Sequence, residues 1–515
     1  MSALAATAAP KIRRELITVS IMLATVMQAL DTTIANVALP HIQGSLSTAS
    51  DQITWVLTSY IVAAAIATPL TGWLAGRFGR KQVFLAAVAG FTFASALCGM
   101  AASLPQIVAF RLLQGLFGAA LVPLSQAVLL DINPPEKHGS AMAIWGAGIM
   151  VGPILGPALG GWLTDHYNWR WVFYINLPVG ILAFLGIAAF VQEHRHDTPG
   201  AFDFLGFASL SLGVGALQMM LDRGEQMGWF GSGEIWIEAL LAGLGFYLFI
   251  THTFTAKTVT FLNRALLKDR NFVAGTVCIF FVGVILYATL ALLPPLLQGL
   301  YNYPVTTSGL VTAPRGIGTM VAMILVGRLI GRVDIRLILA AGLSLTAFSL
   351  WQMTHFSLAM GMRPVILSGI IQGLGLGCTF VPLSVITFST LGKSLRTEGT
   401  AIYSLMRNIG SSIGISVVTA LLTENTQIVH ATLAEHVRAD NPAVVALGVH
   451  LQNASAQYLA VINAQITKQA VMIAYIDDFH LMMWVALMSM PLLLLLRPPG
   501  QKKRGDDEAL TAALD

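Results

Sequence analysis

The chain has 515 residues, of which 56% are hydrophobic and only 10% are charged, against about 25% charged residues in an average soluble protein. This composition excludes a soluble fold, because such a fold could not bury so much apolar surface. The formal net charge of +4 would suit a nucleic-acid-binding protein. The basic residues, however, lie between long apolar stretches, so we expect the lipid bilayer and not nucleic acid as a partner.

Apolar stretches of about 20 residues follow one another along the chain, and this is the length at which an α-helix crosses about 30 Å of hydrocarbon. We expect the first stretch to be a span and not a removable signal, because it carries Asp31 and lacks a small-residue cleavage site. The pattern predicts an all-α integral membrane protein with 14 transmembrane helices. In chain order the spans are predicted near residues 16–37, 54–75, 83–102, 107–130, 139–163, 172–191, 203–222, 235–254, 272–297, 306–327, 335–355, 364–390, 398–423 and 479–496.

The basic residues predict the orientation of these spans. Of the 29 Lys and Arg residues, 21 lie in the segments on the same side as the termini, and five lie in the segments on the opposite side. Loops rich in Lys and Arg stay in the cytoplasm. Both termini are therefore expected to be cytoplasmic, in a multi-pass protein of the bacterial inner membrane.

Three short sequence motifs recur in the same order in the two halves of the chain, which predicts two similar bundles. Spans 1–6 then correspond to spans 9–14, and spans 7–8 are an inserted hairpin, an arrangement typical of transporters. The repeated motifs are GRFGR at 76–80 with GRLIGR at 327–332, QGL and VPLS at 114–125 with the same residues at 372–384, and the glycines of 148–161 with Gly410 and Gly414. The predicted divisions are a tail 1–15, a six-helix bundle 16–191, a linker 192–271 with the two inserted helices, a second six-helix bundle 272–497 that includes an external loop 425–478, and a tail 498–515.

Four motifs carry a resemblance to a known family. They are LDTTIANVALP at 30–40, GWLAGRFGRK at 72–81, RLLQG at 111–115 and GIMVGPILGPALGG at 148–161. From about residue 16 to 497 the chain resembles the major facilitator superfamily, and within it the fourteen-span drug:proton antiporters of the EmrB type. The resemblance implies the major facilitator fold and proton-coupled export of amphipathic drugs or toxic compounds. Relatives carry an acid before the loop arginine, where this chain has Gly76, so a charge relay through that acid is not implied.

Two charged residues at membrane depth are the candidates for proton coupling. Asp31 lies some fifteen residues into the first span, where an unpaired carboxylate is costly and should be neutralised by a proton or by a cation. Arg111 lies a few residues into the fourth span, which enters the membrane from the outside, so it lies at a comparable depth. A carboxyl group that a proton and a cation can both neutralise is able to take up and release protons as access alternates. The alternative is a static ion pair that fixes helix packing.

Two more arginines, Arg315 and Arg407, are predicted at membrane depth with no acid in the same spans. They could pair with Asp31, attract an anionic group of the substrate, or bond to backbone carbonyls as structural struts. Together with buried amides they define a predicted substrate path, although a buried amide also commonly joins two helices. The predicted path residues are Gln28, Asn36, Gln114, Gln126, Arg315, Gln372 and Arg407.

The fifth span carries a predicted helix seam. Glycines recur there every four residues and so fall on one helical face that lets another helix approach closely, while two prolines should bend the helix. Such a face suits helices that rock during alternating access, and it also suits static packing. The predicted seam and gating residues are Gly148, Gly152, Pro153, Gly156, Pro157 and Gly160, with Arg77 and Arg80 of the loop after the second span.

Other classes of function find no support in the sequence. GKS at 392–394 lacks the glycine that a phosphate-binding loop requires at position 387. GSSIG at 410–414 matches a nucleophile elbow only in its letters, since it lies in an apolar helix. We therefore expect no enzyme, catalytic residue, metal or cofactor. A dedicated exporter of one endogenous metabolite, lipid or siderophore in the same fold stays open beside the drug antiporter.

The predicted external loop 425–478 is far longer than the usual connection of about 2–8 residues in a helical bundle. Apolar residues recur in it at helical spacing, first at Val429, Leu433 and Val437 and again at residues 447–462, which predicts two amphipathic helices. Their apolar stripes could face the transporter's own rim, the membrane surface or a partner. The EmrB-type resemblance implies a periplasmic membrane-fusion adaptor that leads to an outer-membrane channel.

Overall fold

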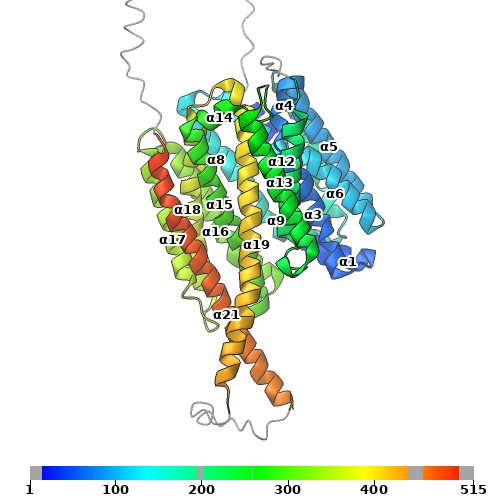
Figure 1. Ribbon diagram of the computed structural model, residues 1–515, viewed down its shortest axis with the longest axis vertical. Helices are drawn as coiled ribbons and strands as arrows, with labels where there is room; N and C mark the ends of the chain where they lie inside the picture. The colour runs from blue at the N-terminus through cyan, green and yellow to red at the C-terminus, as the bar shows by residue number, and fades with distance from the viewer. Residues whose placement is uncertain (1–13, 194–200, 258, 439–455, 498–515) are drawn as a thin grey trace, which may run out of the picture.

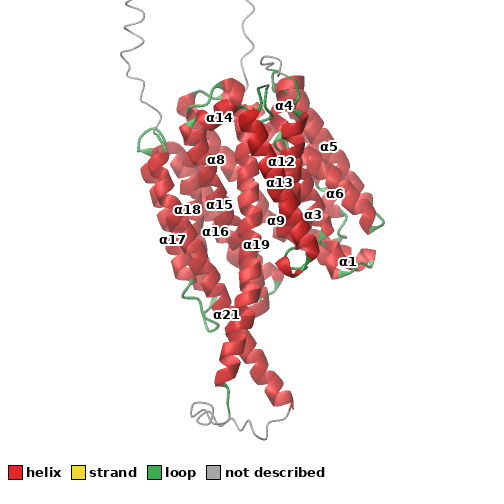
Figure 2. Cartoon of the chain, in the orientation of Figure 1, coloured by secondary structure: helices red, strands yellow, loops and turns green. Residues whose placement is uncertain are grey.

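The computed structural model describes residues 14–193, 201–257, 259–438 and 456–497. In these residues it is built from helices, with one isolated β-bridge between Ile330 and Val333. Thirteen helices are long and apolar enough to cross a membrane, and the bent pair α3 (Trp55–Ala67) and α4 (Leu70–Phe78) brings the count to 14. The predicted all-α membrane fold is therefore confirmed, and Figure 2 shows the long helices lying side by side.

The first part of the chain, which we call the N half, begins with α1. We call the end of the bundle at which α1 begins the inner end and the opposite end the outer end. Pro69 separates α3 from α4, and the two helices meet at 57°, because proline removes a backbone donor. The other helices are α1 (Arg14–Leu46), α5 (Arg80–Met100), α6 (Leu104–Gly118), α7 (Leu121–Ile132), α8 (His138–Ile149), α9 (Val151–His166), α10 (Trp171–Tyr174) and α11 (Asn176–Phe190), with the short α2 (Ser50–Ile53) and η1 (Pro135–Lys137).

The second part of the chain contains an inserted hairpin and the C half, which we define as α14 to α21. The hairpin consists of α12 (Phe204–Arg223) and α13 (Gly233–Thr255), joined through η2 (Trp229–Gly231). The C half consists of α14 (Arg264–Lys268), α15 (Arg270–Pro295), η3 (Leu296–Leu300), α16 (Val305–Leu329), α17 (Ile335–Met353), α18 (Met362–Ser389), η4 (Lys393–Leu395), α19 (Arg396–His436) and α21 (Ala456–Ser489), followed by η6 (Met490–Leu495).

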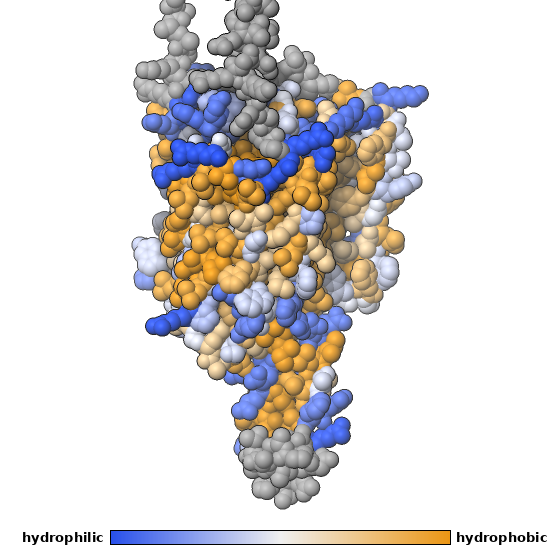
Figure 3. Space-filling model, turned by 90° about the vertical axis from the view of Figure 1, so that its left-hand side faces the viewer, coloured by the Kyte–Doolittle hydropathy of each residue, from blue (hydrophilic) through white to orange (hydrophobic). Residues whose placement is uncertain are grey.

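Helices of each half pack mainly against helices of the same half. In the N half, α1 packs against α9 and α11, and α3 packs against α6. In the C half, α18 packs against α16 and α17, and α15 packs against α19. Contacts between the halves join α16 to α8 and α9, and α19 to α4 and α7. Figure 3 shows an apolar belt between more hydrophilic ends, as expected of a surface that faces lipid.

The predicted external segment 425–478 is helical over its described parts, as its apolar spacing predicted, but these helices are not separate from the spans. Residues 425–436 continue α19, and residues 456–478 belong to α21, so both helices project beyond the outer end of the bundle (Figure 1). The 41 residues of α19 span about 60 Å at a rise of about 1.5 Å per residue, roughly twice the hydrocarbon thickness. A search for apolar runs ends these helices too early, because their projecting parts are amphipathic. Residues 439–455, which include part of the predicted second stripe, lie outside the described residues.

Candidate functional site

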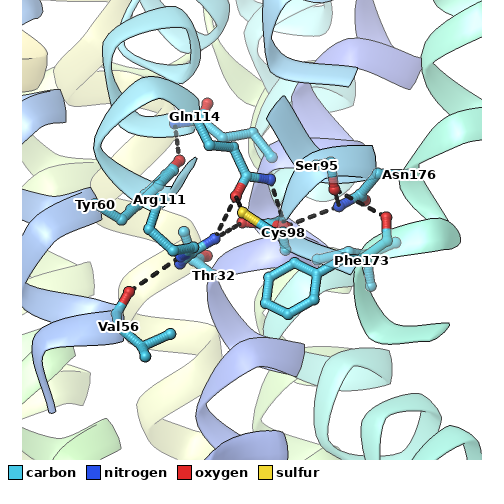
Figure 4. A network of polar contacts seen from close by, with 12 residues as sticks. Thr32, Val56, Tyr60, Ser95, Cys98, Arg111, Gln114, Phe173 and Asn176 are labelled. Carbon is cyan, nitrogen blue, oxygen red and sulfur yellow. Dashed lines mark hydrogen bonds and ion pairs between the residues drawn. The ribbon is translucent and has the colours of Figure 1, made fainter. Parts of the chain in front are cut away.

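Asp31 on α1 is the centre of a buried polar network in the N half. Its side chain is 1% exposed. Nη1 of Arg111 donates to Oδ2 over 2.7 Å, while the amide groups of Gln114 and Asn176 donate to Oδ1 over 2.9 and 2.8 Å. Figure 4 shows the donors converging from α6 and α11. The structure thus brings together the two residues predicted for proton coupling, with both carboxylate oxygens occupied.

Arg111 is held on every side by the N half. Its Nε donates to the Val56 carbonyl over 3.1 Å, its Nη1 also donates to Oε1 of Gln114 over 2.7 Å, and the guanidinium lies 4.4 Å from the ring centre of Tyr60. These partners offset the cost of taking two charges out of water. Asn176 and Tyr60 were not predicted; a polar residue in the sixth apolar stretch was the available signal for Asn176.

The C half has a neutral counterpart of this network. Gln372 of the second QGL motif donates to Oγ1 of Thr289 over 3.2 Å, as Gln114 of the first motif donates to Asp31. Gly369 stands three residues before Gln372, where the N half has Arg111. At these positions the two halves therefore share the amide but not the ion pair, and among the described residues the fully buried carboxyl–guanidinium pair lies in the N half.

A cavity of about 700 Å³ lies between the two halves, and residues of α1, α3, α7, α8, α9, α12, α15, η3, α16 and α19 line it. Its lining reaches Pro40 near the end of α1 and Gln298 in η3, so the cavity extends toward the outer end. Of the predicted path residues, Gln28, Asn36, Arg315 and Arg407 line the cavity, as do Pro153 and Pro157 of the predicted seam.

Three other residues predicted for the substrate path, Gln114, Gln126 and Gln372, lie elsewhere in this conformation. All three are buried but lie outside the cavity wall. Gln114 and Gln372 bond within their own halves, as described above, and the amide of Gln126 contacts the sulfur of Met142 over 3.8 Å. These amides sit on helix faces that pack inside one half, where they join helices.

Arg315 and Arg407 line the cavity without an acidic partner. Arg315 is 5% exposed and Arg407 is 8% exposed. Nη2 of Arg315 donates to the Leu286 carbonyl over 3.2 Å, and Nη2 of Arg407 makes a long contact of 3.4 Å with Asn408. Nη1 of Arg315 and Nε of Arg407 have no hydrogen-bond partner, and within the described chain neither arginine forms an ion pair. Asp31 is paired with Arg111 instead.

The glycine face of the fifth predicted span, which α8 and α9 form together, packs against α1, so these glycines lie inside the N half. A methyl group added at Gly148, Gly152, Gly156 or Gly160 would meet α1, at Met22, Ala29, Thr33 and Ile34 respectively. Oγ1 of Thr33 donates to the Gly152 carbonyl over 3.1 Å. The face of α9 that meets the C half instead carries Ile154, which lies against Gly316 of α16. The glycine spacing predicted a close contact between two helices but did not show that the partner helix is α1.

Contacts between the halves close the cavity at the inner end. Asp131 of α7 forms ion pairs with Arg80 of α5 and with Arg396 of α19, the second over 2.8 Å. Oγ1 of Thr400 donates to the Pro123 carbonyl over 3.1 Å. Arg77, predicted with Arg80 as a gating residue, is exposed. Asp131 and Arg396 were missed, although an acid at the end of the fourth span, among basic inner segments, was a usable signal.

We predict that Asp131→Asn shifts the protein toward a state open at the inner end, because the amide cannot hold both Arg80 and Arg396 as ion pairs. Spin labels at Lys137→Cys and Lys393→Cys, both exposed at the inner end of opposite halves, would report the change by double electron–electron resonance. The longer-distance population should grow several-fold in Asp131→Asn. Glu136→Gln, an exposed acid nearby, is the matched control. An unchanged distance distribution in Asp131→Asn would show that the ion pairs do not hold the gate.

Two helical halves lie around a cavity that is closed at one end, and the described residues hold 13 to 14 helices long and apolar enough to span a membrane. Together these features define a membrane transporter. The sequence profile of the Major Facilitator Superfamily matches residues 21–415. The chain therefore belongs to the major facilitator superfamily, a family of transporters and not of enzymes, and within it to the multidrug export proteins of the EmrB type.

Curated relatives support this assignment, and a solved structure supports the fold. The chain is 37% identical to the fatty acid resistance protein FarB of Neisseria gonorrhoeae over 494 residues, which cover 94% of this chain and 96% of the relative. It is 36% identical to the multidrug export protein EmrB of Escherichia coli K12 over 493 residues, which cover 94% and 95%. In fold it is similar to the proton:xylose symporter XylE, with a TM-score of 0.63 at 14% identity over 96% of this chain and 98% of that one.

Proposed function

We propose that the protein is a proton-coupled antiporter that exports amphipathic molecules with an acidic head group from the bacterial cytoplasm, which faces the inner end. The observation that carries the proposal is the cavity between the halves, whose wall combines apolar side chains with the two unpaired guanidinium groups of Arg315 and Arg407. A volume of about 700 Å³ is in the range that holds a drug-sized molecule, about 300–1,000 Å³.

An anionic head group matches the charges of the wall. A buried, unpaired cation is costly in the membrane, and a guanidinium binds a carboxylate or sulfonate with parallel hydrogen bonds. In the C half Thr289 stands where the N half has Asp31, and within the described chain no acid forms an ion pair with either arginine. The anion can therefore come from the substrate. The relative named for fatty acid resistance and the relatives named for multidrug export both fit cargo with an apolar body.

Proton coupling is assigned to Asp31. In the conformation described here, Arg111, Gln114 and Asn176 all donate to its carboxylate. A change of access that moves these donors away would leave an unpaired carboxylate, which would take up a proton. Alternation between the two arrangements would carry one proton inward for each outward passage of substrate.

The experiment is uptake into inside-out membrane vesicles with an acidic interior. Dodecyl sulfonate and dodecyltrimethylammonium are suitable probes, because they share a chain length, carry opposite permanent charges and are not themselves redistributed by a pH gradient. We expect gradient-driven uptake of the sulfonate to exceed uptake of the ammonium compound. Uptake of both probes without any response to the gradient would contradict proton coupling, and a preference for the cation would contradict the anionic head group.

We also propose that the projecting parts of α19 and α21 dock a periplasmic membrane-fusion adaptor. Within this pair, His430 and Asn463 are hydrogen-bonded over 3.0 Å, and the predicted stripe residues Val429 and Leu433 are only partly exposed. A different apolar set is left in water, at Ile428, Leu459 and Val461. A helical pair with an exposed apolar face suits a helical partner. An outer-membrane channel would complete the export route.

Replacing Ile428, Leu459 and Val461 together by Ser is expected to leave vesicle transport within about twofold of wild type and to lower resistance of whole cells at least tenfold. Vesicle transport should be retained because these side chains lie far from the cavity, whereas resistance should fall because the proposed adaptor contact is lost. Co-purification of the adaptor after cross-linking is the direct measurement. A matched variant changes the exposed polar residues Gln457 and Gln465 to Ala. If the triple variant lost vesicle transport but still captured the adaptor, the projecting parts of α19 and α21 would instead be a structural part of the transporter itself.

A further inference from the structure

The inserted hairpin lies where the two halves of the transporter face each other. Its first helix, α12, packs against α3 of the N half and α19 of the C half, while α13 packs on the outside of α12. Figure 1 shows both helices, in green, between α19 and α3. Most large apolar side chains of α13, such as Leu240 and Tyr247, are exposed, as expected for a helix that faces lipid. The hairpin thus stands between lipid and the interface.

Apolar side chains and hydrogen bonds fix α12 to both halves. Leu210 and Val214 of α12 share a buried cluster with Ala65 of α3 and Leu405 of α19. Toward the outer end, Oγ of Ser416 on α19 donates to the Leu221 carbonyl over 2.6 Å. On the other side, the hydroxyl of Thr58 on α3 donates to Asp222. Because α3 and α19 both wall the cavity, α12 fills the space between two of its walls.

Gln218 is the residue of α12 that reaches the cavity wall, and it is 6% exposed. Its Oε1 accepts a hydrogen bond from the hydroxyl of Ser412 over 2.7 Å. With Oε1 already accepting this bond, both N–H groups of the amide nitrogen remain as donors for a further partner. Within the described chain this nitrogen has no hydrogen-bond partner. A buried amide donor that faces a cavity is suited to an oxygen acceptor of a bound molecule.

We propose that the inserted hairpin is part of the substrate-binding cavity and that Gln218 donates a hydrogen bond to the bound substrate. The inference rests on the proposed function only for the chemical class of that substrate, an amphiphile with oxygen acceptors in its head group. Gln218 then adds a neutral donor to the cationic groups of Arg315 and Arg407. The insertion would thereby distinguish this transporter from a twelve-span bundle in the composition of its binding site.

Cysteine accessibility tests the placement without any assumption about export. In a variant whose native Cys98, Cys278 and Cys378 are replaced by Ala, Gln218→Cys should react with the anionic reagent sulfonatoethyl methanethiosulfonate. Dodecyl sulfonate should slow that reaction several-fold. Ser209→Cys, on the same helix but buried away from the cavity, should stay unreactive, and any labelling of Leu240→Cys should not respond to the probe.

Transport by Gln218→Leu in the native background is the second measurement. Loss of the donor should raise KM for dodecyl sulfonate several-fold with little change in kcat, whereas Ser209→Ala should match wild type. The inference would be overturned if Gln218→Cys were as unreactive as Ser209→Cys. It would also be overturned if Gln218→Cys reacted but neither dodecyl probe slowed the reaction. Protection by dodecyltrimethylammonium alone would support the hairpin's place in the site while contradicting the anionic head group.

Discussion

Asp31→Asn is expected to abolish gradient-driven uptake of dodecyl sulfonate while the chain stays folded and still binds the probe. Asparagine keeps the shape of the side chain and one acceptor oxygen for Arg111, but it cannot exchange a proton. Uptake into vesicles and proton flux reported by a pH-sensitive dye should therefore fall together, by at least tenfold. Asp165→Asn, at the exposed outer end of α9, is the control for loss of a carboxyl group elsewhere.

Arg111→Ala should behave differently from Asp31→Asn. It leaves the carboxylate buried without its cation, and removal of one partner of a buried ion pair typically costs about 3–5 kcal/mol. We expect a lower thermal stability as well as slow transport, whereas Asp31→Asn should lose transport with a smaller loss of stability. Proton exchange by Asp31→Asn at the wild-type rate would exclude Asp31 as the coupling site and leave the pair as a strut between α1 and α6.

The sequence was sufficient for the fold because membrane spans have a strong local signal. A run of about 20 apolar residues predicts a helix whatever lies beside it. Depth made Arg111 a candidate partner of Asp31, while Arg315 and Arg407 stayed open as alternatives. The repeats also located the inserted hairpin. The projecting parts of α19 and α21 were not recognised as continuations of spans, because a hydropathy pattern treats an amphipathic extension as a loop.

Contacts that depend on which way a helix faces could not be read from the sequence. Gln28 and Gln126 are both amides in spans, yet of the two only Gln28 faces the cavity, since the rotation of each helix is set by packing. The ion pair between Asp131 and Arg396 joins residues 265 positions apart. It depends on how the halves meet in one conformation. Gln218 was overlooked for the same reason, because nothing in the sequence shows that α12 lies beside the cavity.

Arg315→Gln is expected to raise KM for dodecyl sulfonate at least tenfold and to leave uptake of dodecyltrimethylammonium unchanged or faster. A hydrogen bond to a charged group contributes about 1.5–3 kcal/mol, and about 1.4 kcal/mol corresponds to a tenfold change in affinity. Arg315→Lys should retain part of the effect, because it keeps the charge but not the parallel hydrogen bonds. Arg332→Gln, an exposed arginine at the inner end of the same half, is the control for lost positive charge.

Thermal stability separates this role of Arg315 from a structural one. Arg315 bears an unpaired nitrogen and one long-range partner, the Leu286 carbonyl, so replacing it by Gln removes a buried, uncompensated charge. The Tm of the substrate-free protein should therefore stay the same or rise. Dodecyl sulfonate should raise the Tm of the wild-type protein, because a ligand stabilises the state that binds it, and this increase should be lost in Arg315→Gln. A lower Tm together with an unchanged KM would identify Arg315 as a strut that holds α16 against α15.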